Sequence, residues 1–576
     1  MTSNAALIKE NKSSTFGQWK YLLWLQGLIL FLTSLLISGY QVYSANHAVH
    51  IPFVQWLSNP SLFPNDPFVS TFVHYIGLIW RLVAITTNFL PLETTLLLLF
   101  LITRALILIA AARLAMALAP GSRLAPVGAM AFFALYPTPI IGHGTLVNNY
   151  FEYTSLAVAF LLLATAAFYT KRPYYWALWL ALGFNLNVLY GFFACVYLAA
   201  VFLTDVHYRS KWKNWVLPGV SFIVLSLPTI VPTASAFRID AVNRELWLRA
   251  SEVRMSYHLY PLTWEPYRFN LFFAFISCFA IILYLGRNEL SKLYKHGMVW
   301  LAVSLCWLLF AFVAAYVVKS PAMLVMHPAR GTDLFYAFAV IAVIAVFAHH
   351  IENYASYKRL LIVLFFFSIL WFWLYEFTFI MEWIFLIIAI AVIWEPLWRV
   401  VLREGNPTRL SNIVILIVMF LGLMTFSIQV YSDRVITIIR YPKSQIREIA
   451  NRATENSSSD DVFLIDPNWE EFRALSQRPV FVTWKDGTAA VWDRSFVEEW
   501  AARIESFGFS FEKTDELGTP DGFRPLTRFY ENMGDEDIIT LSNSYPIRFW
   551  VISVDHTSSF PVVFQTAGYK VLDLKP

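Results

Sequence analysis

The chain has 576 residues, of which 58% are hydrophobic and 14% are charged, and its mean hydropathy is +0.55. Soluble globular proteins carry about a quarter charged residues, so this composition excludes an ordinary soluble protein and indicates one built for a bilayer. The net charge of +4 is spread over many loops without a basic block, which argues against a nucleic-acid partner.

Apolar runs long enough to cross the hydrocarbon core recur along the chain, and about thirteen spans are expected on length. The run at 175–204 is interrupted by Asn185, Asn187 and Gly191, which favours two broken helices that line a cavity. We therefore expect a polytopic α-helical membrane protein with a transmembrane domain at 21–431. The expected spans are 21–40, 94–118, 126–140, 153–170, 175–190, 191–204, 216–235, 269–286, 298–318, 334–349, 359–376, 378–395 and 411–431.

Basic residues in short loops predict the orientation, because such loops stay in the cytoplasm. Residues 1–20 are then a cytoplasmic N-terminal segment, and an odd number of spans places 432–576 outside the cytoplasm. One outer loop, 236–268, breaks the rule with five arginines, which hints at an anionic substrate. The location that follows is the bacterial cytoplasmic (inner) membrane.

The last segment, 432–576, has the composition of a small extracytoplasmic α/β domain. The runs DVFLID, RPVFVTW and RFWVISV are rich in Val, Ile and Phe and are bounded by polar turns, so they predict strands. Residues 443–455 and the run SFVEEWAARIESFGF predict helices, the second ending at a glycine.

The long first outer loop, 41–92, places Asn46, His47, His50 and Asp66 near the membrane surface. A carboxylate with histidines close by suits a general base. The Asn-Asp-Pro sequence around Asp66 equally fits a helix N-cap followed by proline. The histidines, with His143 in the next outer loop, suit either acid–base work or simple hydrogen bonds.

The stretch 68–90 predicts an amphipathic helix on the interface that carries Arg81. In the next outer loop, Glu152 is the second candidate acid, although a carboxylate at a helix start also suits the helix dipole. Arg330, in the sequence VMHPARGTD, fits a phosphate contact, an interfacial anchor or a salt bridge to Asp333.

The pattern His-x-x-x-Pro-Phe followed by Asn-Pro-Ser-Leu-Phe-Pro-x-Asp-Pro-Phe-Val resembles the first outer loop of a bacterial family of polytopic membrane proteins. That family is similar to the GT-C superfamily of membrane glycosyltransferases, which includes oligosaccharyltransferases and protein mannosyltransferases. The resemblance continues at Gly142, His143 and Glu152, at Leu-Tyr-Gly of 189–191, at His-Pro-Ala-Arg of 327–330 and at DVFLIDPNWEEFRALSQRPVFVTWK in the tail.

The resemblance implies transfer of a sugar from a polyprenyl-phosphate donor to a saccharide or protein acceptor at the outer face of the membrane. It implies catalysis by Asp66, His47, His50 and Glu152, and substrate binding by Arg330, Arg81, His143, Asn46 and Tyr190. GT-C enzymes place one or two acids in the first outer loop, whereas this loop retains only Asp66. We therefore expect no cofactor, with a divalent metal as the alternative.

Two other functions stay open on the sequence. A transporter or flippase of a lipid-linked or anionic solute would use the broken segment 175–204, but it should show a second copy of that segment. A non-enzymatic envelope assembly protein would use the outer domain to bind a polymer or partner.

Overall fold

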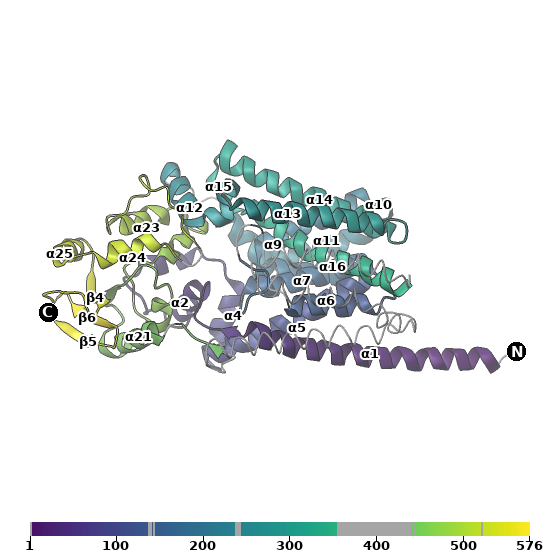
Figure 1. Cartoon of the computed structure of the whole chain (residues 1–576), viewed down its shortest axis with the longest axis horizontal. Coiled ribbons are helices and arrows are strands. Elements are labelled where there is room, and N and C mark those ends of the chain that lie inside the picture. Colours follow the sequence, from purple (N-terminus) through teal and green to yellow (C-terminus); the bar gives the residue numbers. More distant parts are fainter. Residues whose placement is uncertain are drawn as a thin grey trace, which may run out of the picture.

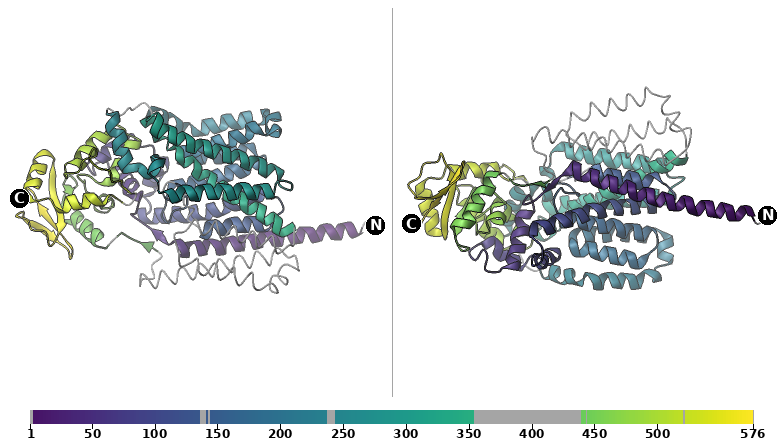
Figure 2. Two further views of the ribbon diagram at one scale, coloured as in Figure 1. Left: turned by 45° about the horizontal axis from the view of Figure 1, so that its top comes forward. Right: turned by 90° about the horizontal axis from the view of Figure 1, so that it is seen from below.

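The computed structural model describes residues 3–135, 141, 144–236, 243–353, 439–442, 444–519 and 522–575. The expected spans at 359–376, 378–395 and 411–431 lie outside these residues, as does His143. A bundle of lengthwise helices carries a smaller mixed body at one end, and the N-terminus extends from the other end (Figures 1 and 2).

The bundle consists of apolar helices that are joined partly by short turns and partly by long loops. Six helices among the described residues are long and apolar enough to cross a membrane, or seven if a bent pair in the first outer loop counts as one span. The chain is thus an integral membrane protein, and the total of thirteen spans stays a prediction. The bundle helices are α1 (Ser3–Ser38), α5 (Leu92–Leu118), α6 (Leu124–Leu135), α7 (Tyr153–Tyr169), α8 (Pro173–Leu186), α9 (Val188–Thr204), α11 (Lys213–Ala236), α13 (Pro266–Leu285), α14 (Ser291–Phe312) and α16 (Gly331–Asn353).

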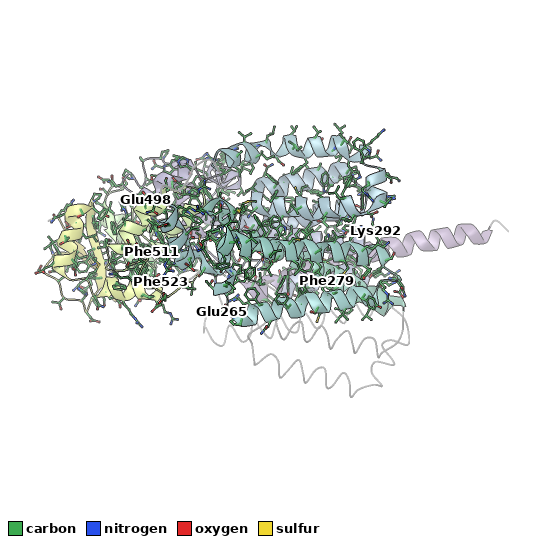
Figure 3. The ribbon with its side chains drawn as sticks, turned by 90° about the horizontal axis from the view of Figure 1, so that it is seen from above. Glu265, Phe279, Lys292, Glu498, Phe511 and Phe523 are labelled. Atoms are coloured by element: carbon green, nitrogen blue, oxygen red, sulfur yellow. The ribbon has the colours of Figure 1, made fainter. Side chains whose placement is uncertain are left out.

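Burial differs sharply between the bundle helices. The apolar window of α16 is 100% buried, whereas that of α11 is only 17% buried, so α16 forms the centre and α11 an edge that faces outward. Helices in lipid associate by close packing of small residues, and alanines such as Ala111, Ala157 and Ala342 are fully buried here. Lys292 lies at the end of the bundle opposite Glu498 and Phe511 (Figure 3).

The expected interruption at 175–204 is a one-residue break between α8 and α9. Asn187 ends α8 and caps α9, where its side chain accepts a hydrogen bond from the Tyr190 amide at 3.1 Å. Gly191 lies against α8, since a Cβ added to it would come within 2.6 Å of the Phe184 Cα. The break brings polar side chains to the outer end of the bundle while satisfying the exposed backbone.

The first outer loop folds into short helices beneath the mixed body. The single helix expected at 68–90 is wrong: the chain bends by 105° between Pro67–Val73 and Leu78–Thr86, with Gly77 between them. The elements on this side of the bundle are α2 (His47–Ser58), α3 (Pro67–Ser70), η1 (Thr71–Val73), α4 (Leu78–Thr86), α12 (Arg244–Leu259), η2 (Pro261–Thr263), the π-turn η3 (Val313–Val317), α15 (Pro321–Val325) and η4 (Pro328–Arg330). On the opposite side lies α10 (Val206–Ser210).

The C-terminal residues from 444 onward form a four-stranded sheet with helices, and its strand order is β3-β4-β6-β5. Strands β3 and β4 run parallel, and the remaining pairs are antiparallel. A separate parallel pair, β1 (Tyr40–Gln41) with β2 (Ile439–Arg440), joins the end of α1 to the entry of this domain. The domain contains α21 (Ser444–Asn456), β3 (Val462–Leu464), α22 (Phe472–Ser476), η5 (Trp484–Val491), α23 (Phe496–Glu505), α24 (Arg524–Glu531), α25 (Asp535–Ser544), β4 (Ile547–Ser553), β5 (Val562–Gln565) and β6 (Tyr569–Asp573).

The run RPVFVTW is not a strand, contrary to expectation. Only Val480 forms an isolated bridge, to Phe463 of β3. β3 holds part of its backbone, since the Phe481 amide donates to the Phe463 carbonyl at 2.8 Å and the Pro479 carbonyl accepts from the Phe463 amide at 2.9 Å. Side chains take other groups: the Val480 amide donates to Asp66, and the Phe481 carbonyl accepts from Arg503 at 2.8 Å. Long-range side-chain partners therefore take some of the backbone groups that a full strand pairing would use.

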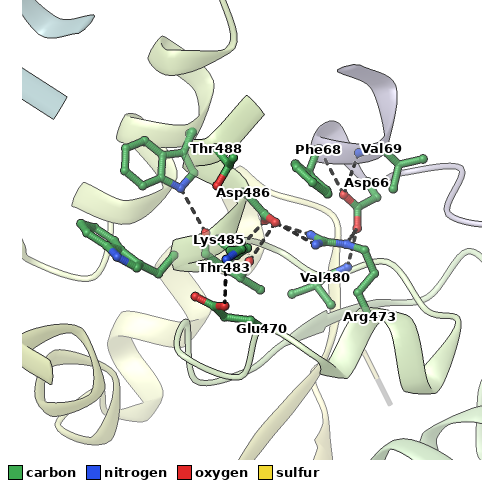
Figure 4. Close-up of polar contacts among 12 residues, drawn as sticks. Asp66, Phe68, Val69, Glu470, Arg473, Val480, Thr483, Lys485, Asp486 and Thr488 are labelled. Carbon is green, nitrogen blue, oxygen red and sulfur yellow. Dashed lines mark hydrogen bonds and ion pairs between the residues drawn. The ribbon is translucent and has the colours of Figure 1, made fainter. Parts of the chain in front are cut away.

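A buried ion-pair network fastens the first outer loop to the C-terminal domain (Figure 4). Arg473 donates from Nε to Asp66 at 2.6 Å and from Nη1 and Nη2 to the two oxygens of Asp486 at 2.8 and 2.9 Å. All three residues are buried. Burial alone would lower the pKa of Arg473, but Asp486 and Asp66 raise it above its ordinary value, so the guanidinium stays charged.

Around this network, one continuous apolar core runs from the first outer loop through α12 into the C-terminal domain. It includes Phe72, Trp80, Trp247, Trp484 and Trp550, each fully buried. The loop and the domain therefore fold as one body on the end of the bundle.

Arg473→Met should lower the free energy of unfolding by about 3–5 kcal/mol, because it leaves two carboxylates buried without their cation. The matched control is Arg548→Met, which breaks the pair with Asp573 where the Arg548 side chain is 40% exposed and should cost less than about 1 kcal/mol. Thermal unfolding and limited proteolysis of the purified proteins measure both. Equal stability of the two variants would contradict the network's role.

Gly191→Ala should destabilise the α8–α9 junction, since its methyl group would collide with the backbone of Phe184. Gly219→Ala, on the outward-facing α11 with no atom within 4 Å of the added Cβ, should be neutral or slightly stabilising. Melting temperatures in the same detergent compare the two. A tolerated methyl group at 191 would show that the close approach is wrong.

Candidate functional site

A cavity of about 490 Å³ lies where one end of the bundle meets the first outer loop and the C-terminal domain. Polar and charged side chains from widely separated segments line it, and apolar residues of the α8–α9 break continue its wall. The polar and aromatic lining includes Asn46, His50, Tyr75, Tyr150, Glu152, Tyr153, Asn185, Asn187, Tyr190, Thr229, His258, His327, Arg330, Lys485, Thr488, Trp492 and Arg494.

Glu152 is the one carboxylate among the described residues that line this cavity. It caps α7, and its Oε2 accepts from Asn46 Nδ2 at 3.0 Å while Oε1 accepts from the Thr154 amide and hydroxyl at 3.4 Å. Burial raises the pKa of Glu152 above its ordinary value, although Asn46, Thr154 and the charge of Arg330 act in the opposite direction. Such a carboxylate binds protons more strongly than an exposed one.

Arg330 ends the short helix η4 and faces the same cavity. Its Nη2 donates to His258 Nε2 at 2.6 Å, and its buried Nε has no hydrogen-bond partner among the residues that the structure describes. The turn before it is strained, because His327 has a φ of +45° directly before Pro328. Strain of this kind at a cavity is typical of functional sites.

Tyr190 joins the cavity to a second buried acid. Its hydroxyl donates to Asp333 Oδ2 at 2.8 Å, and Asp333 is 2% exposed. Arg330 also interacts electrostatically with Tyr190, Asp333 and Glu152. Arg330 thus donates a hydrogen bond to His258 and attracts Asp333 electrostatically, while Asp333 accepts a hydrogen bond from Tyr190.

His50 sits in an aromatic box at the cavity wall. Its ring stacks on Trp80 at 4.3 Å and meets Tyr153 edge-on at 5.3 Å, and its Nδ1 is buried without a hydrogen-bond partner. Burial first, then the charges of His47 and Lys485, lower the pKa of His50 well below its ordinary value. A neutral imidazole with an open nitrogen can accept or relay a proton.

The structure brings together five of the nine site residues that the sequence indicates. Asn46, His50, Glu152, Tyr190 and Arg330 all line the cavity.

Three of the remaining residues lie elsewhere, and His143 is outside the described part. Asp66 does not line the cavity, contrary to the expectation that it is a catalytic residue there. It caps α3 through the Phe68 and Val69 amides and is paired with Arg473. His47 is buried against the Phe151 carbonyl at 3.1 Å, and burial lowers its pKa to about 4. Arg81 is exposed and stacks over Phe53.

Several cavity residues had no signal in the sequence. His258 lies in the basic loop 236–268, where only the arginines indicate a binding role in the sequence. Lys485, Trp492 and Arg494 belong to the C-terminal domain. Arg254, in that same loop, is 1% exposed and supports the domain rather than the cavity. Only the three-dimensional packing of the domain on the loop reveals these partners.

A metal site would need a cluster of ligands. Within the described ranges, no group of three or more His, Cys, Asp or Glu side chains could hold a metal ion. Asp66 and Glu152, the two acids that a divalent metal would have used, occupy different environments. The cavity can instead pair one basic carboxylate with cationic groups that suit an anion.

Comparison with known proteins gives the following similarities. A family model described as "Domain of unknown function (DUF6798)" matches residues 444–507. No curated protein matches the chain.

Among solved structures, ArnT from Cupriavidus metallidurans bound to undecaprenyl phosphate is 13% identical, covering 96% of this chain and 98% of that one, with a TM-score of 0.43. The oligosaccharyltransferase of Archaeoglobus fulgidus in the apo form is 11% identical, covering 93% and 70%, with a TM-score of 0.48. The same enzyme tethered to an acceptor peptide is 13% identical, covering 93% and 69%, with a TM-score of 0.44. These structural neighbours are glycosyltransferases of the GT-C superfamily.

Proposed function

We propose that this protein is a membrane glycosyltransferase that moves a sugar from a polyprenyl-phosphate donor to an acceptor at the outer face of the bacterial cytoplasmic membrane. The observation that carries the proposal is the convergence of Glu152 and Arg330 in one cavity. In this arrangement the N-terminus is cytoplasmic, the chain crosses the membrane about thirteen times, and the C-terminal domain is extracytoplasmic.

Glu152 replaces Asp66 as the general base. Its buried carboxylate has a raised pKa, which makes it a stronger base than an exposed glutamate while it can still be ionised. Asn46 and Thr154 hold the carboxylate in one orientation. A fixed carboxylate that faces a cavity is the arrangement that proton abstraction from an acceptor hydroxyl requires.

Arg330 suits the leaving phosphate. A guanidinium meets phosphate oxygens with several N–H groups, and the Nε of Arg330 is a buried donor without a protein partner. His258 holds the other side of the guanidinium. A bound anion would accept a hydrogen bond from the Nε of Arg330 and would replace the water that burial removes from this guanidinium.

The transfer step follows from these positions. The acceptor hydroxyl oxygen forms a bond to the anomeric carbon of the sugar, its proton passes to Glu152, and the bond from that carbon to the phosphate oxygen breaks. The bonding electrons leave with the lipid phosphate, whose added charge Arg330 stabilises. A fixed cation of this kind accelerates the transfer because it stabilises the negative charge that develops on the leaving phosphate in the transition state.

The side of the cavity toward α11 suits the lipid chain of the donor. Asn185 and the apolar Leu186, Val188 and Leu189 at the α8–α9 break line it, together with Thr229 of α11. Thr229 donates to Asn185 Oδ1 at 2.8 Å, so these polar contacts reach α11, which has the smallest buried share of the candidate spans among the described residues. A headgroup in the cavity can therefore remain attached to a chain in the bilayer.

Glu152→Gln should reduce the rate of sugar transfer by about 10²–10⁴-fold, because the amide cannot take the acceptor proton. Glu265→Gln, at an exposed position outside the cavity, serves as the matched control and should be fully active. Transfer from a polyprenyl-phosphate donor in reconstituted membranes is the measurement. Wild-type activity of the Glu152→Gln variant would remove Glu152 from the mechanism.

The pH dependence provides a second check on Glu152. Because burial raises its pKa, the carboxylate is protonated at a higher pH than an exposed glutamate, and the base is lost as pH falls through that value. The transfer rate should therefore decline on the acidic side at a pH above the ordinary glutamate range of about 4.3. A profile that stays flat through this region contradicts the assignment.

Arg330→Gln should weaken binding of undecaprenyl phosphate by about 10–100-fold, since a charged hydrogen bond contributes about 1.5–3 kcal/mol. Arg81→Gln removes an exposed arginine outside the cavity and should leave the dissociation constant unchanged. Native mass spectrometry of the purified proteins gives both values. If the two substitutions weaken undecaprenyl phosphate binding equally, the headgroup lies outside this cavity.

A further inference from the structure

The C-terminal domain forms part of the cavity wall and does not merely cover it. One short segment, 485–494, contributes Lys485, Thr488, Val491, Trp492 and Arg494 to the lining. Trp492 also meets Tyr75 of the first outer loop at 4.8 Å, and its Nε1 donates to Thr71 at 3.0 Å. The wall is therefore continuous between the domain and the loop.

Buried contacts hold this segment rigidly. Arg254, which is 1% exposed, donates from Nε to the Trp484 carbonyl at 2.7 Å and from Nη2 to Thr488 Oγ1 at 3.3 Å. At the start of η5, Thr483 and Asp486 form a capping box. Asp486 is also held by Arg473. The side chains of this segment are thus presented by a preorganised wall.

The charges of the cavity fall into two groups. Arg330 interacts with Glu152, Tyr190 and Asp333 on the bundle side. Lys485 interacts with His50 and belongs to the domain side. Among the described lining residues, Arg330, Lys485 and Arg494 are permanent cations and Glu152 is the only carboxylate.

Lys485 is placed to receive an anion. Its side chain is only 9% exposed, yet the residue lines the cavity. The carboxylate nearest to its Nζ, that of Glu470, lies 3.8 Å away, longer than a charge-assisted hydrogen bond (Figure 4). A largely desolvated ammonium with one distant partner gains from a further acidic group.

We propose, on the basis of the proposed glycosyltransferase function, that Lys485 and its segment form a second anion subsite that binds a carboxylate or phosphate on the acceptor. The lipid phosphate lies beside Arg330, because its chain must reach the bilayer at the bundle. The acceptor approaches from the domain side, so its acidic group meets Lys485 while its hydroxyl reaches Glu152. The enzyme thus prefers acidic acceptors.

The test measures the local charge at the subsite from the labelling rates of one introduced cysteine. In the full-length protein with Cys195, Cys278 and Cys306 replaced by alanine, Val491→Cys places a thiol on the same wall. A negatively charged and a positively charged methanethiosulfonate reagent then label it, each normalised to its rate with a free thiol. The anionic reagent should react about tenfold faster, because one unit charge a few ångströms away changes the local ion concentration several-fold.

Lys485→Gln should lower the ratio of the anionic to the cationic labelling rate several-fold, whereas Lys513→Gln, at an exposed site of the same domain, should leave the ratio unchanged. Inorganic phosphate and glucuronate should each slow labelling of the cysteine in the presence of Lys485 and not in its absence. Glucose, an uncharged match for glucuronate, should not protect. A ratio near one in the parent protein, or a thiol that neither reagent reaches, overturns the proposal.

Undecaprenyl phosphate separates this subsite from the donor site. Its binding should depend on Arg330 and survive Lys485→Gln. If Lys485→Gln abolishes lipid binding and soluble anions never protect the cysteine, Lys485 belongs to the donor site and the second subsite is rejected, while the glycosyltransferase proposal stands. If undecaprenyl phosphate binds no variant although soluble anions protect, the subsite stands and the proposed function fails.

Discussion

The arrangement of the first outer loop and the C-terminal domain depends on one buried guanidinium held between two carboxylates. Arg473 joins Asp66, 407 residues earlier in the chain, to Asp486 beside the cavity wall. Buried charges are costly unless they are paired and fully hydrogen-bonded, so these three groups have one favourable arrangement. That arrangement fixes the register between the first outer loop and the C-terminal domain. The apolar core that runs through both then excludes water around it.

The cavity exists because these bodies meet at the broken end of the bundle. Asn187 satisfies the backbone at the α8–α9 break, and Glu152 caps the neighbouring helix while facing the same space. Both side chains serve the local structure and the site together. Two buried polar atoms of cavity residues, His50 Nδ1 and Arg330 Nε, have no hydrogen-bond partner among the described residues. Such atoms are costly in a folded protein, and a bound polar ligand would remove that cost.

The sequence predicts the membrane helices well, because a bilayer leaves the backbone few alternatives to a helix. It also singles out Glu152, Arg330 and Tyr190, which lie near helix ends and line one cavity in the structure. It fails where partners are distant in the chain: Asn-Asp-Pro indicates the cap at Asp66, but nothing local reveals Arg473. The run RPVFVTW is wrongly predicted to be a strand for a similar reason, since side chains from distant segments take some of its backbone hydrogen bonds. Lys485 becomes a site residue only through domain packing.

The most direct test of the central claim is a cryo-electron microscopy structure of the full-length protein in nanodiscs with undecaprenyl phosphate. We expect headgroup density in the cavity, with the phosphate within hydrogen-bonding distance of Arg330, the lipid chain leaving between α8 and α11, and the Asp66–Arg473–Asp486 network intact. A phosphate bound elsewhere on the molecule, or a network that opens so that Asp66 contacts the headgroup, would contradict it.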